Sequence, residues 1–172
     1  MKLVQTIGVW GDSVMKGVIY DESRGKYALL PENGADRASR KLGLKLFNRS
    51  RMGCTVTKGL SLLKKDLQHE QTGCDAALIE FGGNDCDYDW EQVALAPDGE
   101  HQPKTPLPQF IASLREMIQL VRQKGMEPVL MTLPPIHAQR YFDFFTRTGL
   151  SGENILYWLG DVQHIYRWHE RY

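Results

Sequence analysis

The sequence lacks several features that would point to a partner or a cellular setting. Its 172 residues carry no excess charge, because 21 Lys and Arg balance 21 Asp and Glu, and no basic or acidic run stands out. This balance argues against a nucleic acid or an anionic membrane as partner. No apolar run is long enough to span a bilayer, and the N-terminus shows no apolar signal core. We therefore expect a cytoplasmic protein.

Cysteine is scarce as well. Cys54, Cys74 and Cys86 are odd in number and have no metal-binding spacing, so free thiols in a reducing compartment are the simpler interpretation. The acidic stretch that begins at Asp85 has some likeness to a calcium loop, but Trp90 stands where an EF-hand needs glycine. The interpretation of those acids is a solvated loop, and the sequence predicts neither a metal nor a cofactor.

What the sequence does contain is an alternation of apolar runs of strand length with stretches of helical periodicity. No repeat or linker divides the chain, so we expect one domain over residues 1–172. The alternation predicts an α/β fold with a mostly parallel sheet. The expected strands span residues 3–10, 44–47, 76–81 and 128–133. The expected helices span residues 14–20, 33–42, 56–71, 107–124 and 154–172.

Polar residues follow three of the expected strands. The first strand leads into Asp12 and Ser13, the second into a polar loop with Gly53, and the third into Asn84. Because the carboxyl ends of parallel strands meet at one edge of a sheet, these residues are expected to lie together. Ser13 is a candidate nucleophile, and the N–H groups of Ser13 and Gly53 with the Asn84 amide would form an oxyanion hole. The competing interpretation is that each serves only as a helix cap or a turn residue.

These motifs resemble those of the SGNH hydrolases, also called GDSL-type esterases and lipases. Gly11-Asp12-Ser13 matches the first motif, with Val14 in place of the leucine; Asn48 followed by Gly53 is similar to the second; and Gly82-Gly83-Asn84-Asp85 matches the third. The resemblance implies a flavodoxin-like three-layer α/β/α sandwich. It also implies cofactor-free hydrolysis of a small acyl ester, an acetylated sugar or a thioester, with Ser13 as nucleophile and Gly53 and Asn84 as oxyanion donors.

The last motif of that family, Asp-x-x-His, supplies the general base. Asp161-Val162-Gln163-His164 has the spacing, but it falls inside an expected helix, so Asp161 and His164 are interpreted as ordinary helix positions. We expect the base in a longer chain, on a further strand and loop beyond Tyr172. His137 follows a strand end closely enough to line the pocket. The histidines interpreted as surface or loop residues are His69, His101, His137 and His169.

Two other functions stay open at the level of the sequence. A protein of the same fold without a working base would be a binding module for a small molecule. A flavodoxin-like binder of phosphate or nucleotide would use residues 11–13 as an anion loop, although the charge of Asp12 would repel a phosphate. The aromatic stretch 141–145 is interpreted as core in preference to an apolar wall for an acyl chain.

Overall fold

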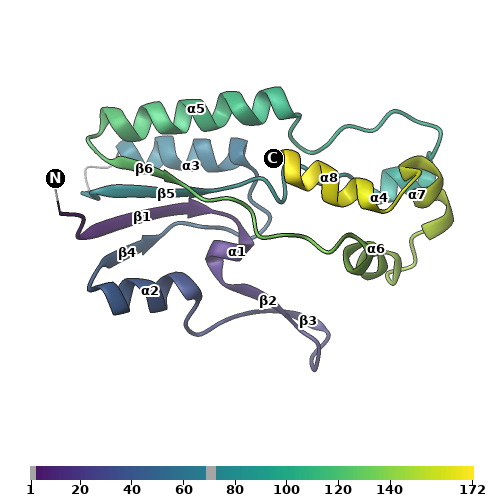
Figure 1. Cartoon of the computed structure of the whole chain (residues 1–172), viewed down its shortest axis with the longest axis horizontal. Helices are drawn as coiled ribbons and strands as arrows, with labels where there is room; N and C mark the ends of the chain where they lie inside the picture. The colour runs from purple at the N-terminus through teal and green to yellow at the C-terminus, as the bar shows by residue number, and fades with distance from the viewer. Residues whose placement is uncertain (1–2, 69–72) are drawn as a thin grey trace.

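The chain folds around one parallel sheet, shown in the computed structural model of Figure 1, which describes residues 3–68 and 73–172. Four strands lie in the order β4-β1-β5-β6, all of them parallel. Their bounds are β1 (Thr6–Gly11), β4 (Lys45–Asn48), β5 (Ala76–Glu80) and β6 (Glu127–Leu130). These are the four strands expected from the sequence, with ends that differ by a few residues, so the prediction of a parallel sheet is confirmed.

Helices cover both faces of this sheet. Two helices, α3 and α5, pack side by side on one face, and α2 lies on the other (Figure 1). Their bounds are α2 (Gly34–Leu42), α3 (Val56–Gln68) and α5 (Leu107–Gln123). The sheet and the α3–α5 layer enclose a core in which Leu63, Ile79 and Met117 are almost fully buried. This arrangement confirms the three-layer α/β/α fold class.

The first helix, α1 (Ser13–Lys16), is shorter than the helix expected over residues 14–20. Gly17 ends it with a φ of +81°, a left-handed conformation that favours glycine. The β-branched and aromatic residues that follow suit a strand better than a helix. They form β2 (Val18–Asp21), which pairs antiparallel with β3 (Lys26–Leu29) in a hairpin that projects from the sheet (Figure 1). The expectation of helix through residue 20 is therefore wrong.

Four short helices pack together beyond the carboxyl ends of the strands, outside the three layers of the sandwich (Figure 1). We call them the cap: α4 (Trp90–Leu95), α6 (Ala138–Thr146), α7 (Gly152–Leu159) and α8 (Gln163–Arg171). Their apolar side chains gather in a cluster separate from the sheet core, with Trp90, Phe145 and Ile155 among its buried members. The rings of Trp90 and Phe145 stack with centroids 4.5 Å apart.

The cap departs from the sequence expectations in two places. Helix α4 lies in the stretch after Asp85 that was interpreted as a solvated loop. The single helix expected over residues 154–172 is divided into α7 and α8 at Gly160, which has a φ of +71°. A glycine in this conformation ends a helix without the steric cost that another residue would bear. Within residues 3–68 and 73–172, no helix combines the length and the apolar character that a membrane span requires.

Candidate active site

Ser13 stands at the carboxyl edge of the sheet, as the first residue of α1 and two residues after the end of β1. The capping role belongs to Asp12, whose Oδ1 accepts a hydrogen bond of 2.8 Å from the N–H of Val14. Among the described residues, the Ser13 hydroxyl has no hydrogen-bond partner, and Ser13 is half-buried at the wall of a pocket. Asp12 therefore holds the turn while the Ser13 hydroxyl is left for other chemistry.

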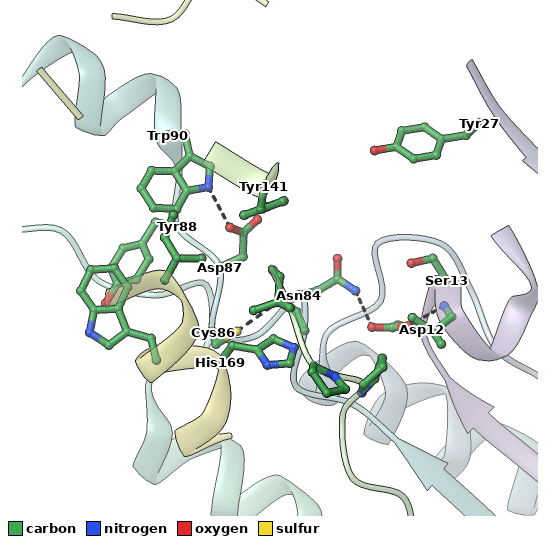
Figure 2. Close-up of a pocket in the computed structure, with 17 residues that line it drawn as sticks. Asp12, Ser13, Tyr27, Asn84, Cys86, Asp87, Tyr88, Trp90, Tyr141 and His169 are labelled. Atoms are coloured by element: carbon green, nitrogen blue, oxygen red, sulfur yellow. Dashed lines mark hydrogen bonds between the residues drawn. The ribbon is translucent and has the colours of Figure 1, made fainter. Parts of the chain in front are cut away.

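Asn84 lies beside this turn. Its side-chain nitrogen, Nδ2, donates to Oδ2 of Asp12 at 3.0 Å and to the carbonyl of Cys54 at 3.3 Å, as Figure 2 shows for Asp12. Asn84 and Ser13 line the same pocket, as the sequence predicts. Both N–H groups of the amide are donated within the protein here, so stabilising an oxyanion would require one of them to turn to the substrate.

Gly53 lies in the loop between β4 and α3. The loop is joined to the end of β1 by a 3.1 Å hydrogen bond from the N–H of Arg51 to the carbonyl of Gly11. Gly53 is exposed and lines a neighbouring cavity with Cys54 and Lys58, and it is outside the lining of the Ser13 pocket. The structure thus brings Ser13 and Asn84 together in one pocket and places Gly53 in the lining of another. Its role as an oxyanion donor stays a prediction.

The Ser13 pocket is a cavity of about 360 Å³ between the sheet edge and the cap (Figure 2). The sheet edge contributes Asp12, Ser13 and Asn84. The opposite walls are mainly aromatic and come from the hairpin, the cap and the segment before it, with the rings of Tyr27, Tyr88, Trp90, Tyr141 and Trp168. No Lys or Arg of the described chain lines this pocket, whereas Asp12 and Asp87 do. The lining therefore disfavours an anionic ligand and offers apolar surface to a neutral one.

The aromatic stretch 141–145 serves both functions weighed for it. Tyr141 lines the pocket, and Phe145 is buried in the cap core. Phe144 contacts the hairpin, with its ring centroid 5.4 Å from that of Tyr20 and 6.4 Å from that of Tyr27. The stretch is therefore core on one side and pocket wall on the other.

His169 is a pocket residue that the sequence reasoning missed. It lies on α8, is 9% exposed and lines the Ser13 pocket, so its interpretation as a surface or loop residue is wrong. Its side chain makes no hydrogen bond with any described residue. Burial lowers its pKa, against a smaller opposing effect of the Asp12 charge, so the imidazole is neutral near pH 7. The sequence signal that could have found His169 is its four-residue spacing from Ile165, which places both side chains on one face of α8; Ile165 also lines the pocket.

The other histidines that the structure describes are outside the lining of the Ser13 pocket. His164 Nδ1 is 2.7 Å from the carbonyl of Leu159, and its ring stacks on Trp168. Asp161 is exposed, and its Oδ1 accepts a hydrogen bond from the N–H of Gln163. Neither residue of the Asp-x-x-His sequence lines the pocket.

His137 is exposed and caps α6 instead of lining the pocket. His101 is half-buried beside Trp158, with its Nε2 2.9 Å from the carbonyl of Ala96. His69 falls outside the described residues. Of the histidines that the structure describes, His169 alone lines the pocket.

The acids that follow β5 have structural partners, which corrects their interpretation as a solvated loop. Asp85 is fully buried, and its carboxylate accepts the N–H of Val56 at 2.9 Å. Asp87 accepts from Trp90 Nε1 and pairs with Lys104 at 2.7 Å. In the part of the chain that the structure describes, no group of three or more His, Cys, Asp or Glu side chains could hold a metal ion.

A second missed residue is Glu80, the last residue of β5, which is 1% exposed. Its Oε2 accepts the N–H of Asp12 at 3.2 Å. Burial and the charge of Asp12 raise the pKa of Glu80 to about 7, and burial also raises the pKa of Asp12. The signal in the sequence was a single acid in an otherwise apolar strand.

Neither the family models nor the curated proteins match the chain. Solved structures do. A lipase/acylhydrolase from Enterococcus faecalis matches with a TM-score of 0.55 and 22% identity, covering 96% of this chain and 72% of that one. TesA matches with a TM-score of 0.51 and 24% identity, covering 95% and 75% of the two chains. AlinE4, an SGNH-hydrolase family esterase, matches with a TM-score of 0.52 and 21% identity, covering 90% and 74%. At these identities the likeness is one of fold, and the chain has the α/β fold of the SGNH hydrolases.

Proposed function

We propose that the protein hydrolyses carboxylic esters with Ser13 as the nucleophile. The observation that carries this proposal is the position of the Ser13 hydroxyl, free of any described hydrogen-bond partner, at the wall of a pocket that also holds the Asn84 amide. The solved structures of similar fold are esterases and acylhydrolases, which supports the same reaction class. The fold alone would leave the reaction open, because one fold serves many activities.

In the proposed reaction the Ser13 oxygen attacks the ester carbonyl carbon while its proton passes to a general base. The negative charge then rests on the former carbonyl oxygen, near the N–H of Ser13 and the Asn84 amide, with Gly53 as the third predicted donor. Collapse of this intermediate breaks the bond to the alcohol, which leaves with the proton, and an acyl-enzyme remains. Water attacks the acyl group in the same way and restores Ser13. A base contributes about a hundredfold to ten-thousandfold to such a rate.

The pocket lining supports an uncharged acyl group. Asp12 and Asp87 are the charged side chains of the lining. Lys104, which is outside the lining, pairs with Asp87, and no Lys or Arg of the described residues pairs with Asp12. Rings such as Trp168 and Tyr141 offer apolar surface for an alkyl chain, an aryl group or the face of a sugar. Alkyl esters and acetylated sugars therefore suit the site better than thioesters whose leaving group carries phosphates.

The proposal is tested by steady-state hydrolysis of p-nitrophenyl butyrate. Wild-type protein is expected to turn over, and Ser13→Ala is expected to reduce kcat by at least about a thousandfold, because removing the nucleophile leaves only binding and the oxyanion donors. Ser61→Ala is the matched control, since Ser61 is an exposed serine on α3 that is outside the pocket lining. Turnover that survives in Ser13→Ala would contradict the proposal.

A binding module of the same fold is the second candidate. One observation favours it: among the described residues, no histidine makes a hydrogen bond with Ser13, so the hydroxyl has no base in contact with it. The binding module predicts no turnover of p-nitrophenyl butyrate by the wild-type protein and no reaction of Ser13 with a fluorophosphonate. An esterase is expected to turn over p-nitrophenyl butyrate and to react with the fluorophosphonate at Ser13.

A further inference from the structure

Glu80 poses a problem that the proposed reaction leaves unsolved. Gly11 of β1 is its register partner in the parallel pair with β5, which sets the Glu80 carboxyl directly behind the turn that carries Ser13. Oε2 of Glu80 accepts the N–H of Asp12, but its Oε1 is buried and has no hydrogen-bond partner among the described residues. Buried polar atoms in native proteins are nearly always paired, so an unpartnered carboxylate oxygen on a residue that is 1% exposed needs a physical explanation.

The surroundings of Glu80 oppose a negative charge there. Asp12 is only 3% exposed and Asp85 is fully buried, so two further carboxyl groups lie close to Glu80 with little access to water. His169 is the nearby group whose positive charge would help, and burial favours its neutral form. No ion pair with Lys or Arg reaches Asp12, Glu80 or Asp85 in the described chain. Buried carboxyl groups that lie together cannot all ionise at low cost.

We propose that Glu80 keeps its proton at mildly acidic pH and donates a hydrogen bond to the carboxylate of Asp12, so that Glu80 acts as a positioning residue for the turn that presents Ser13. The shared proton supplies the missing partner: the carboxyl group of Glu80 then accepts from the N–H of Asp12 and donates to the Asp12 side chain. Its consequence for catalysis rests on the proposed function of Ser13, whereas the protonation of Glu80 does not.

Glu80 holds the proton, and not Asp12, because the two carboxyl groups differ in their donors. Asp12 accepts from the N–H of Val14 at 2.8 Å and from Asn84 at 3.0 Å, and both bonds stabilise its ionised form. Glu80 accepts one longer bond of 3.2 Å. Burial raises the pKa of both groups, and the charge of Asp12 raises that of Glu80 further, to about 7.

The proposed hydrogen bond between Glu80 and Asp12 should be lost as the pH rises, so the Ser13 turn should become less ordered. When Glu80 ionises near pH 7, its donor is lost and two like charges face each other behind Ser13. The folded pKa of about 7 lies above the ordinary value of 4.5, so the unfolded chain releases this proton at lower pH than the folded one. The stability contributed by Glu80 is therefore full below pH 4.5, falls as the pH rises toward 7, and is lost above it.

The protonation is tested directly by ¹³C NMR of the side-chain carboxyl groups in the wild-type protein. The Glu80 signal is assigned by its absence in Glu80→Gln and followed from pH 4 to pH 9. The expected midpoint lies near 7. A midpoint near the ordinary 4.5 would overturn the proposal, whatever the protein hydrolyses.

The positioning role is tested with two variants and a control. Wild-type kcat is expected to decline above pH 7 as Glu80 ionises. Glu80→Gln keeps a donor for Asp12 and an acceptor for its N–H, so its kcat at pH 6 should stay within about threefold of wild type and should not show this decline. Glu80→Leu keeps the volume but no donor, and kcat at pH 6 should fall at least about tenfold, the value of one lost hydrogen bond to a charged group. Glu91→Gln, an exposed acid on α4, should match wild type throughout.

A Glu80→Gln enzyme that keeps the wild-type decline above pH 7 would overturn the positioning role, and so would a Glu80→Leu enzyme with wild-type kcat. These outcomes differ from failure of the proposed function, in which the wild-type protein shows no turnover at all. In that case the NMR midpoint still decides whether Glu80 carries the proton.

Discussion

The two sides of the pocket are built in different ways. On the sheet side, Asp12 and Asn84 are held by short hydrogen bonds that fix where the Ser13 turn lies. On the cap side, the walls are rings packed against rings, as where Tyr88 contacts Trp168 with centroids 4.8 Å apart. Hydrogen bonds between polar atoms fix the geometry of the sheet side, whereas the packing of aromatic rings fixes that of the cap side. Reactive chemistry is therefore expected from the strand ends, and selection among substrates from the cap.

The two sides also differ in what holds them together. The sheet core joins β1 and β5 to α3 and α5, whose lengths of 13 and 17 residues are large for this chain. The cap helices have only 6 to 9 residues each. Helices this short are not stable alone in water, so the cap depends on its aromatic cluster. The cap is thus the less independent of the two regions.

The largest expected contrast between the two sides is in catalysis. Asn84→Ala should lower kcat on p-nitrophenyl butyrate by about a hundredfold or more, because it removes a donor to the developing oxyanion. Asn154→Ala is the matched change in the cap, where Nδ2 of Asn154 donates to the carbonyl of Ala94. That variant should change kcat by less than about twofold. Equal effects of the two substitutions on kcat would mean that the sheet side and the cap side do not differ in their contribution to catalysis.

The next contrast concerns stability. Leu63 and Ile155 are both fully buried, one in the sheet core and one in the cap. Truncation of either to Ala should cost about 2–5 kcal/mol locally, from lost burial and the cavity left behind. Hydrogen exchange should show that Ile155→Ala speeds exchange in the cap amides and leaves β1 and β5 protected, whereas Leu63→Ala speeds it throughout. Uniform acceleration in both variants would mean that the cap and the sheet unfold as one unit.

The smallest contrast is in substrate binding. Trp168→Ala should raise KM for p-nitrophenyl butyrate by roughly threefold to tenfold, the value of an aromatic contact, and leave kcat within about twofold. Trp158→Ala is the control, because Trp158 contacts Trp168 in the cap but is outside the pocket lining. A drop in kcat with unchanged KM in Trp168→Ala would assign the ring a role in the chemical step instead.

The same division separates what the sequence could predict from what it could not. The strand ends carry their information locally: a short apolar run followed by Asp12-Ser13 or by Asn84 specifies both the edge of the sheet and the residues on it. The hairpin after Gly17 and the break at Gly160 were missed because a left-handed glycine resembles any other glycine in sequence. His169 was missed because its helical step from Ile165 shows which face of α8 it shares, but does not show that this face lines the pocket.

Glu80 lies between these cases. Its position in an apolar strand was visible in the sequence, but its meaning came from Asp12, which is 68 residues earlier in the chain and adjacent in the fold. The charge of a residue is local information, whereas the pKa that results from burial and from a second carboxyl group is not.

The most direct test of the account is covalent labelling of the intact protein with a fluorophosphonate, followed by peptide mass spectrometry. If Ser13 is the nucleophile, an adduct forms on Ser13 faster than on any other serine, and Ser13→Ala has no adduct at that position. The absence of any adduct under conditions in which the protein is folded, or an adduct on a different serine, would contradict the assignment of Ser13 as the nucleophile.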